Sequence, residues 1–364
     1  MKSASRRRSR RPAFFIAGAV LLAALLTWLL WPVDPYALPG GDWRLFKKRF
    51  LAPEGRIMDD ENGGISHSEG QGYGMLLAVA FRDREAFDRI WTWTSKNLKR
   101  HDDYLFSWKW TPGADGKPGA VGDSNNATDG DLLIAWALLR AHREWGDLKY
   151  QQAAGQIVVA VLDRTTVPTY LGLQLLPGLA GFQSPHGVVL NPSYYVFPAF
   201  TELSAAFLSD KWQLLRDGGF MLLRTAQFGE WRLAPDWTLV ADHWLALAPN
   251  HDPDFGYNAI RVPLNLAWDD PASPLLKPYI AFWESSPAVK WTPAVLNLDT
   301  GTYGPYAALP GMLAVRELAL ACAKKNNLTV TQIPRLTTEE SYYSASLKLL
   351  VKVAIRERFG PKRN

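Results

Sequence analysis

The segment Asp131–Leu139, with the sequence DLLIAWALL, decides the expected fold because only its first residue is polar. A helix that is apolar on every side is buried all round, so other elements must surround it. The next segment, Tyr150–Leu162, instead separates glutamines on one face from isoleucine and valine on another, which is typical of a helix with one face toward solvent. Joined by the short turn Gly146–Asp147, the two segments predict a hairpin of one inner and one outer helix.

The same alternation recurs at a period of about 60 residues, which is the mark of a repeated architecture. Glu69, Asp129, Tyr194 and Asn258 each stand where an inner helix is expected to begin. Long loops separate the pairs and should gather above these four residues, at the end of the molecule where binding and chemistry usually lie. The repeat predicts an all-α (α/α)6 barrel, with a plain helical solenoid as the alternative. The expected pairs are 69–82 with 84–99, 130–145 with 148–164, 193–208 with 211–228, 257–269 with 274–285, and 305–325 with 338–358.

The amino terminus has the composition of a membrane anchor. Six positive charges precede the first acid, Asp34, and they exceed the whole formal charge of +5, so the rest of the chain lacks the basic footprint of a nucleic-acid-binding protein. The uncharged run Ala13–Trp31 is near the length that crosses a bilayer, and the basic residues before it favour a cytoplasmic amino terminus. We predict an uncleaved anchor at residues 1–35, with a cleaved signal peptide as the alternative, and one barrel domain at 36–364 in a bacterial periplasm.

Two acidic phrases stand at the starts of expected inner helices. Glu69 lies among small residues ahead of an apolar helix, where a carboxyl group is a candidate general acid or a simple first-turn acid favoured by the helix dipole. Asp129 and Asp131 flank Gly130, and capping explains only one of them. A carboxylate pair at a barrel mouth can bind sugar hydroxyls and stabilise an oxocarbenium-like transition state.

Arg261 and Tyr194 stand at two further inner-helix starts. An arginine inside an otherwise apolar helix cannot lose its charge, so it must find an acceptor, and Asp129 or Glu69 is the expected partner. Tyr194 can be a core residue or can hydrogen-bond a sugar or a water. A single cysteine, Cys322, excludes an internal disulfide framework and a cysteine-based zinc site.

Four ordered phrases together resemble glycoside hydrolase family 8, and within it the cellulases encoded with bacterial cellulose synthase. They are Ser68–Met75 (SEGQGYGM), Ala127–Asp131 (ATDGD), Leu190–Tyr194 (LNPSY) and Tyr257–Arg261 (YNAIR), in a resemblance that covers roughly residues 40–330. The resemblance implies an (α/α)6 barrel that hydrolyses β-1,4-linked glucans with inversion, without a metal or another cofactor. It also implies a β-1,4-glucan chain as substrate and a cellulose synthase complex as partner.

The resemblance implies roles for individual residues. Glu69 matches the general acid, and Asp129 matches the aspartate that contacts the sugar at the cleavage point, where electrostatic and positioning roles suit an inverting enzyme. Tyr194 and Arg261 match residues that line the same subsite. The side chains expected to bind substrate are Trp108, Trp110, Asp131, Tyr194 and Arg261, of which the two tryptophans would stack on sugar rings.

Asn258 departs from the family pattern, because many members have at this position the aspartate that deprotonates the attacking water. An amide can orient water but cannot take its proton. One reading draws the base from the preceding loop, where Asp254, Asp252 and Asp242 are candidates. In a second interpretation the protein is a slow enzyme or a non-catalytic glucan binder. In a third, the asparagine is a substitution made to trap substrate.

The sequence leaves three functions open. The first is an endo-1,4-β-glucanase, and the second is a non-catalytic protein that binds or guides a glucan chain. The third keeps the fold but acts on chitosan, xylan or mixed-linkage glucan, since one fold hosts several activities. A chitosanase needs extra acids in its cleft, and the loop with Asp236, Asp242, Asp252 and Asp254 keeps that reading open.

Overall fold

The computed structural model describes residues 34–113, 117–285, 290–324 and 327–361. Most of the predicted leader, residues 1–33, lies outside them, so the expected anchor or signal segment is not described. Within the described ranges, no helix has both the length and the apolar character that crossing a membrane requires.

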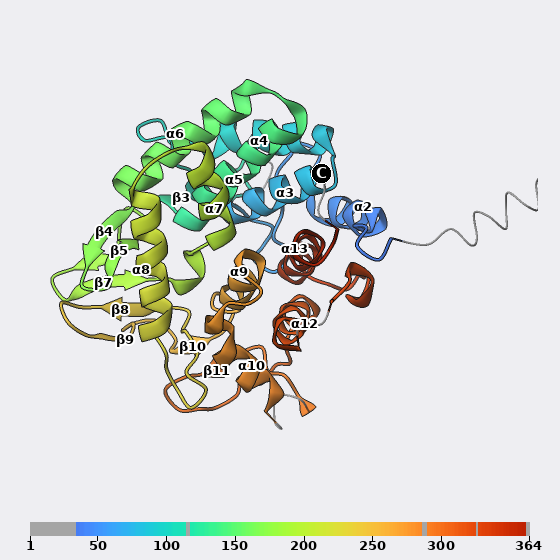
Figure 1. The fold of residues 1–364 in the computed structure, drawn as a ribbon. Coiled ribbons are helices and arrows are strands. Elements are labelled where there is room, and N and C mark those ends of the chain that lie inside the picture. The colour runs from blue at the N-terminus through green and yellow to red at the C-terminus, as the bar shows by residue number, and fades with distance from the viewer. Residues whose placement is uncertain (1–33, 114–116, 286–289, 325–326, 362–364) are drawn as a thin grey trace, which may run out of the picture.

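The helices form the expected pairs (Figure 1). The outer members of the first four pairs are amphipathic, as α4 shows with Phe87 and Ile90 buried and its charged residues outside. The pairs are α3 (Ser68–Ala80) with α4 (Arg84–Asn97), α5 (Thr128–Trp145) with α6 (Leu148–Arg164), α7 (Phe197–Ala206) with α8 (Lys211–Thr225), α9 (Arg261–Asp269) with α10 (Lys277–Glu284), and α12 (Pro310–Lys324) with α13 (Tyr342–Arg358). Short 3-10 helices η1 (Pro192–Tyr194), η2 (Pro274–Leu276) and η3 (Val330–Gln332) lie between them.

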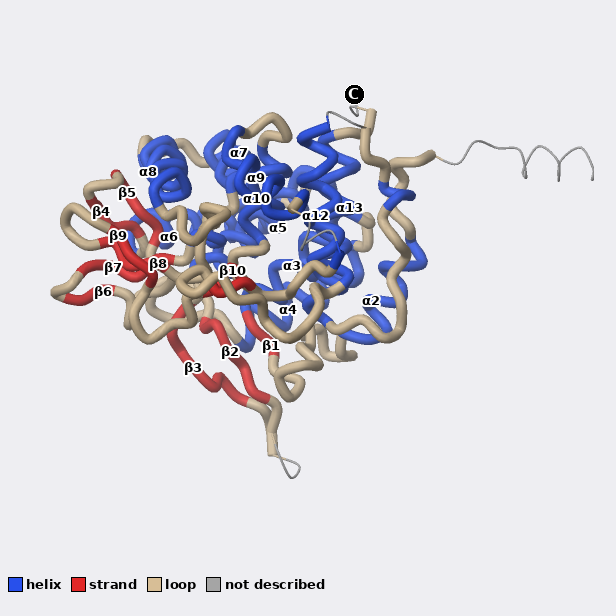
Figure 2. The backbone as a smooth tube through the Cα atoms, turned by 90° about the horizontal axis from the view of Figure 1, so that it is seen from below, coloured by secondary structure: helices blue, strands red, loops and turns tan. Residues whose placement is uncertain are grey.

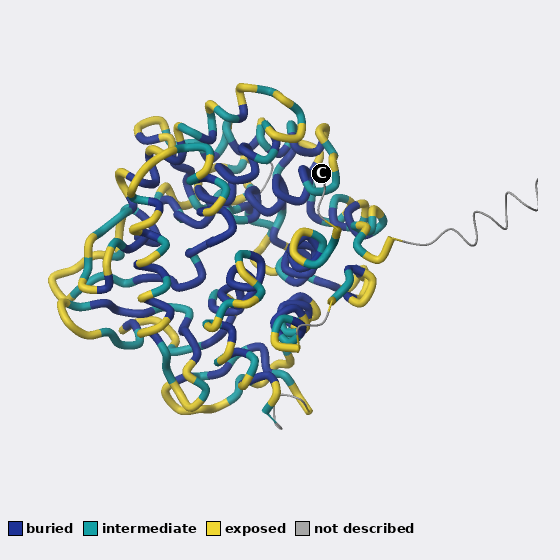
Figure 3. Tube along the Cα trace, viewed as in Figure 1, coloured by how far each residue is buried: buried dark blue, intermediate teal, exposed yellow. Residues whose placement is uncertain are grey.

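The interior of the barrel is formed by α3, α5, α7, α9 and α13, each of which packs on the next, with α13 returning to α3. In the last pair the second helix is the inner one, since residues 344–355 of α13 are all buried while α12 keeps an exposed side (Figure 3). One helix was not expected, α2 (Gly40–Phe50), which packs outside α13. The two layers of helices fit the predicted (α/α)6 barrel, with five inner helices rather than six among the described residues.

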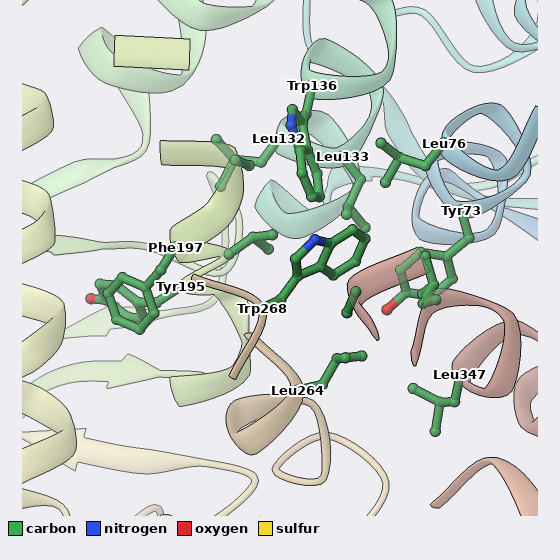
Figure 4. Close-up of a cluster of buried hydrophobic side chains, with 14 of the residues drawn as sticks. Tyr73, Leu76, Leu132, Leu133, Trp136, Tyr195, Phe197, Leu264, Trp268 and Leu347 are labelled. Atoms are coloured by element: carbon green, nitrogen blue, oxygen red, sulfur yellow. The ribbon is translucent and has the colours of Figure 1, made fainter. Parts of the chain in front are cut away.

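The core lies where the inner helices meet (Figure 4). Trp136 of α5 and Trp268 of α9 face each other with ring centroids 5.0 Å apart, and Leu133, Leu264 and Tyr73 pack around them. Because these large side chains fill the middle of the barrel, the polar residues at the helix starts lie on a packed apolar base.

The long segments between the pairs contain short strands, which the sequence did not indicate, and Figure 2 shows them gathered on one side of the helices. Pairing of Val188 with Val240 joins two loops that belong to different hairpins. The antiparallel sheets are β1 (Ser66–His67), β2 (Ser107–Thr111) and β3 (Ala120–Asn126); β6 (Gln183–Ser184), β7 (Gly187–Leu190), β8 (Thr238–Val240) and β9 (Leu245–Leu247); β4 (Thr166–Thr169) with β5 (Gly172–Leu175); and β10 (Asp254–Phe255) with β11 (Leu296–Asn297).

Candidate active site

A cavity of about 620 Å³ opens among the loops at the starts of the inner helices. Five of the predicted site residues line it, namely Glu69, Trp108, Asp129, Tyr194 and Asn258. They come from α3, β2, α5, η1 and the turn before α9. The structure therefore gathers at one place residues that the sequence spreads over about half the chain.

Glycines allow α3 and α5 to approach closely at this cavity. A Cβ added to Gly130 would lie 2.2 Å from Ser68 Oγ, and one added to Gly72 would lie 2.6 Å from Leu133 Cβ. Neither contact is sterically allowed, so a side chain at either glycine would push the two helices apart. The close approach places Glu69 and Asp129, each the second residue of its helix, beside each other.

Arg261, the first residue of α9, connects the two acids. Its Nη1 donates to Glu69 Oε2 and, at 2.8 Å, to Asp129 Oδ2, while its Nη2 donates to Asn258 Oδ1 at 2.8 Å. The guanidinium also lies over the ring of Tyr194, with 5.6 Å to the centroid. Arg261 is only 5% exposed, so these acceptors take the place of water, as predicted for an arginine in an apolar helix.

The buried carboxyl of Asp129 has a strongly shifted acidity. Burial raises its pKa to about 7, the negative charge of Glu69 adds to the rise, and Arg261 works against it. Burial therefore favours the neutral form of the Asp129 carboxyl more than water does.

His67 and Asp59 also line the cavity, and the sequence interpretation missed both. His67 caps α3, because its Nδ1 accepts the N–H of Gly70 at 3.0 Å, and its Nε2 lies 3.5 Å from Asp59 Oδ2. Burial opposes a charge on His67, but Asp59 and the nearby Glu69 raise its pKa overall. The available signal was a histidine directly ahead of a helix, where serine, threonine, asparagine or aspartate is the usual cap.

Hydrogen bonds fix the orientation of the Asn258 amide. Its Oδ1 accepts from Arg261 Nη2 at 2.8 Å and from Asn191 Nδ2 at 3.2 Å. Asn191 presents its Nδ2 because its own Oδ1 accepts from the N–H and the hydroxyl of Ser193. Two donors therefore converge on one oxygen of residue 258.

The two predicted tryptophans are both half-buried and differ in what surrounds their rings. Trp108 lines the cavity and is half-buried. Trp110 packs edge-on against Trp93 at 5.4 Å and lies under the guanidinium of Arg56 at 4.9 Å. Lys109 Nζ also lies 5.5 Å from the ring centroid of Trp108, but of the two tryptophans Trp108 is the one that lines the cavity, where it can stack on substrate.

Asp131 is fully buried and does not line the cavity. Its Oδ1 accepts the N–H of Phe106 and its Oδ2 accepts Asn126 Nδ2, both at 2.8 Å. It therefore connects the start of α5 to the residue before β2 and to the end of β3. This placement corrects the expectation that Asp131 contacts sugar directly.

The candidate bases of the preceding loop do not line the cavity around Glu69. Asp252 and Asp242 are exposed and line neither this cavity nor the next. Asp254 lines a separate cavity of about 450 Å³ with Tyr257 and other residues, and burial raises its pKa. Among the described residues, no cluster of three or more histidine, cysteine or acidic side chains has a metal-binding arrangement.

Three comparisons with known proteins show which family this chain resembles. The model of Glycosyl hydrolases family 8 matches residues 21–357. An endoglucanase of Cellulomonas uda is 42% identical over 302 residues, which are 82% of each chain. Among solved structures, a GH8 endo-β-1,4-glucanase from an Achatina fulica gut metagenomic library has a TM-score of 0.81 at 42% identity, covering 87% of this chain and 98% of its own. A family 8 endoglucanase from Klebsiella pneumoniae has a TM-score of 0.80 at 41% identity, covering 86% and 98%.

Proposed function

Because the chain belongs to the glycosyl hydrolases family 8, we propose that it is an endo-acting β-1,4-glucanase that cleaves with inversion. The observation that supports this proposal best is the Arg261 guanidinium, which holds Glu69 and Asp129 together at a cavity also lined by Trp108 and Tyr194. An aromatic face, a paired acid and an open cavity are the parts that glycoside cleavage needs.

In the proposed reaction Glu69 protonates the leaving glycosidic oxygen. Asp129 and Arg261 hold the sugar ring at the cleavage point and stabilise the positive charge that develops on it. Trp108 stacks on a neighbouring sugar. We assign to Asn258 the orientation of the attacking water, and because an amide cannot take a proton, that water releases its proton to solvent.

Asp129 does not act as the base in this reaction. It and Glu69 bind the same nitrogen of Arg261, so their carboxylates are closer together than the roughly 6.5–9.5 Å of an inverting pair. No room remains between them for the attacking water. The resemblance assigns the base position to residue 258, and with an amide there we propose a slow enzyme.

The test compares reducing-end release from carboxymethylcellulose by residues 34–364 and by the Glu69→Gln variant. Loss of the acid should lower kcat by about 10²–10⁴-fold. Glu230→Gln is the matched control, because Glu230 is exposed and does not line the cavity. Equal activity in all three proteins would refute Glu69 as the acid.

The amide of Asn258, which two hydrogen bonds hold in one orientation, also favours a second candidate function. This function is that of a non-catalytic glucan-binding protein. In that case wild-type protein would bind cellohexaose in calorimetry without releasing reducing ends. Xylan, chitosan and mixed-linkage glucan belong in the same activity assay, since the fold alone does not select the polysaccharide.

We propose further that the protein acts outside the inner membrane, beside a cellulose synthase complex. The basic cluster and the uncharged run Ala13–Trp31 support export, and the resemblance to cellulases encoded with cellulose synthase supports the partner. Protease treatment of spheroplasts should degrade the barrel only if it is exported. Copurification with the synthase, compared between the full chain and a chain without residues 2–31, tests the association.

A further inference from the structure

Asp236 lies in the loop before β8, and its side chain reaches the turn that precedes α9. Its Oδ1 accepts three backbone N–H groups, those of Gly256 at 3.1 Å, Asn258 at 3.1 Å and Ala259 at 2.6 Å. Helix starts usually receive such bonds from their own cap residue, but Ile260, which precedes α9, has no side-chain acceptor. A carboxylate from an earlier loop therefore caps this turn.

The capped turn carries the groups that face the two acids. Asn258 belongs to the turn, and its carbonyl oxygen accepts the N–H of Arg261 at 3.1 Å. The side chains of the same two residues bind each other at 2.8 Å. A displacement of this backbone would move the amide and the guanidinium together, away from Glu69 and Asp129.

The loop of Asp236 is itself held against the turn. Its N–H donates to the carbonyl oxygen of Asp254 at 2.6 Å, so the backbone is fixed on the side from which the carboxylate projects. A Cβ on Gly256 would lie 3.0 Å from Asp236 Oδ2, which shows how closely the carboxyl and the turn approach.

The hydrogen bonds of Asp236 can form whether its carboxyl group is charged or neutral. Burial raises its pKa to about 6, while the N–H groups of Ala259 and Gly256 and the Arg261 charge lower it and the neighbouring Asp254 raises it. A proton on Oδ2 leaves Oδ1 free to accept all three bonds, as an amide oxygen would. Asp236 does not line the cavity around Glu69, so it is not placed to deprotonate a water there.

We propose that Asp236 is a positioning residue of the active site, whose Oδ1 holds the Gly256–Ala259 turn so that Asn258 and Arg261 face Glu69 and Asp129. The inference rests on the proposed glucanase function. It assigns to the loop before β8 a part in catalysis without contact to substrate.

The test measures kcat and KM on cellohexaose for Asp236→Ala and Asp236→Asn. Loss of the acceptor should lower kcat by roughly 10²-fold, because small misplacements of catalytic groups have effects of this size. KM should change by less than about threefold if the substitution weakens binding of the transition state more than binding of the substrate. Asn keeps an acceptor oxygen and should retain at least half of the activity. Asp299→Ala, an exposed acid in a nearby loop, is the matched control and should behave as wild type.

Two outcomes would overturn the proposal. One is an alanine variant with wild-type kcat, and the other is an asparagine variant as inactive as the alanine variant, which would mean that the charge matters rather than the hydrogen bonds. Should Asp236→Ala not fold, Asp236→Ser replaces it, since its short hydroxyl cannot reach all three N–H groups.

Amide hydrogen exchange separates this proposal from the proposed function. The N–H groups of Gly256, Asn258 and Ala259 should lose protection in Asp236→Ala and keep it in Asp236→Asn. Wild-type protein that cleaves no cellohexaose would refute the glucanase function, and the exchange pattern would then decide whether Asp236 holds the turn. Unchanged protection in the alanine variant would refute that role in either case.

Discussion

Residue 258 stands where two donors, Arg261 Nη2 and Asn191 Nδ2, converge on one side-chain oxygen. A carboxylate at this position would accept both bonds with one oxygen and leave the other free as a base. We expect Asn258→Asp to raise kcat on carboxymethylcellulose by about 10²-fold, the lower end of what a general base contributes.

Azide provides the control for this variant, because an anion that attacks the sugar needs no base. Sodium azide should accelerate wild-type protein and yield an α-glycosyl azide, with little effect on Asn258→Asp. An Asn258→Asp protein no faster than wild type, together with no azide effect, would show that loss of the base does not limit the rate.

Arg261 shows what the sequence could predict at the level of single residues. Its charge and its apolar surroundings were sufficient to predict an acidic partner, and the structure gives it two. Asp131 was not predictable in the same way. It binds the N–H of Phe106 and the amide of Asn126. No sequence pattern at these residues shows whether Asp131 holds two chain segments in place or binds sugar.

At the level of elements, the helices were predictable and the strands were not. The apolar and amphipathic runs gave the five pairs because they persist over many turns. The strands are only two to seven residues long, and β7 pairs with β8 from another hairpin. Segments this short show no reliable alternation, so the sheets that border the cavity follow from the packing of the loops.

The start of α5 contains a carboxyl whose burial affects stability. Burial raises the pKa of Asp131 to about 8, well above the 3.8 of an unfolded aspartate. Between these pH values the folded state binds the extra proton, so the contribution of Asp131 to the free energy of unfolding falls as pH rises from about 4 to 8. The slope for one proton is at most about 1.4 kcal/mol per pH unit.

Urea unfolding of wild type and Asp131→Asn across this pH range tests the prediction. The asparagine variant should be less stable at low pH, by roughly 1–3 kcal/mol, since one buried donor loses its acceptor. The difference should narrow as pH rises, because only wild type has a proton to lose. A constant difference would mean that Asp131 does not titrate in this range.

At the scale of the whole molecule, the contact that secures α2 to the barrel could not be read from the sequence. Asp42 of α2 binds Lys352 of α13 and Arg335, about 300 residues away along the chain. No local pattern reports a pairing at that separation, and α2 was not predicted at all. The periodic repeat predicted the hairpins but not how the ends of the chain meet.

Removal of Asp42 should destabilise the barrel because it leaves a buried ammonium without its partner. Lys352 and Asp42 have 0% and 3% of their side chains exposed, and truncation of one member of a buried pair costs about 3–5 kcal/mol. Arg335→Gln removes the other, 65% exposed partner of the same carboxylate and should lower the free energy of unfolding by less than about 1 kcal/mol.

Urea unfolding of Asp42→Ala, Arg335→Gln and the double variant Asp42→Leu/Lys352→Met measures these free energies. The double variant should recover much of the stability that Asp42→Ala loses, since no charge stays buried. Equal effects of the two single variants would show that the exposed arginine, rather than the buried lysine, secures α2 to the barrel.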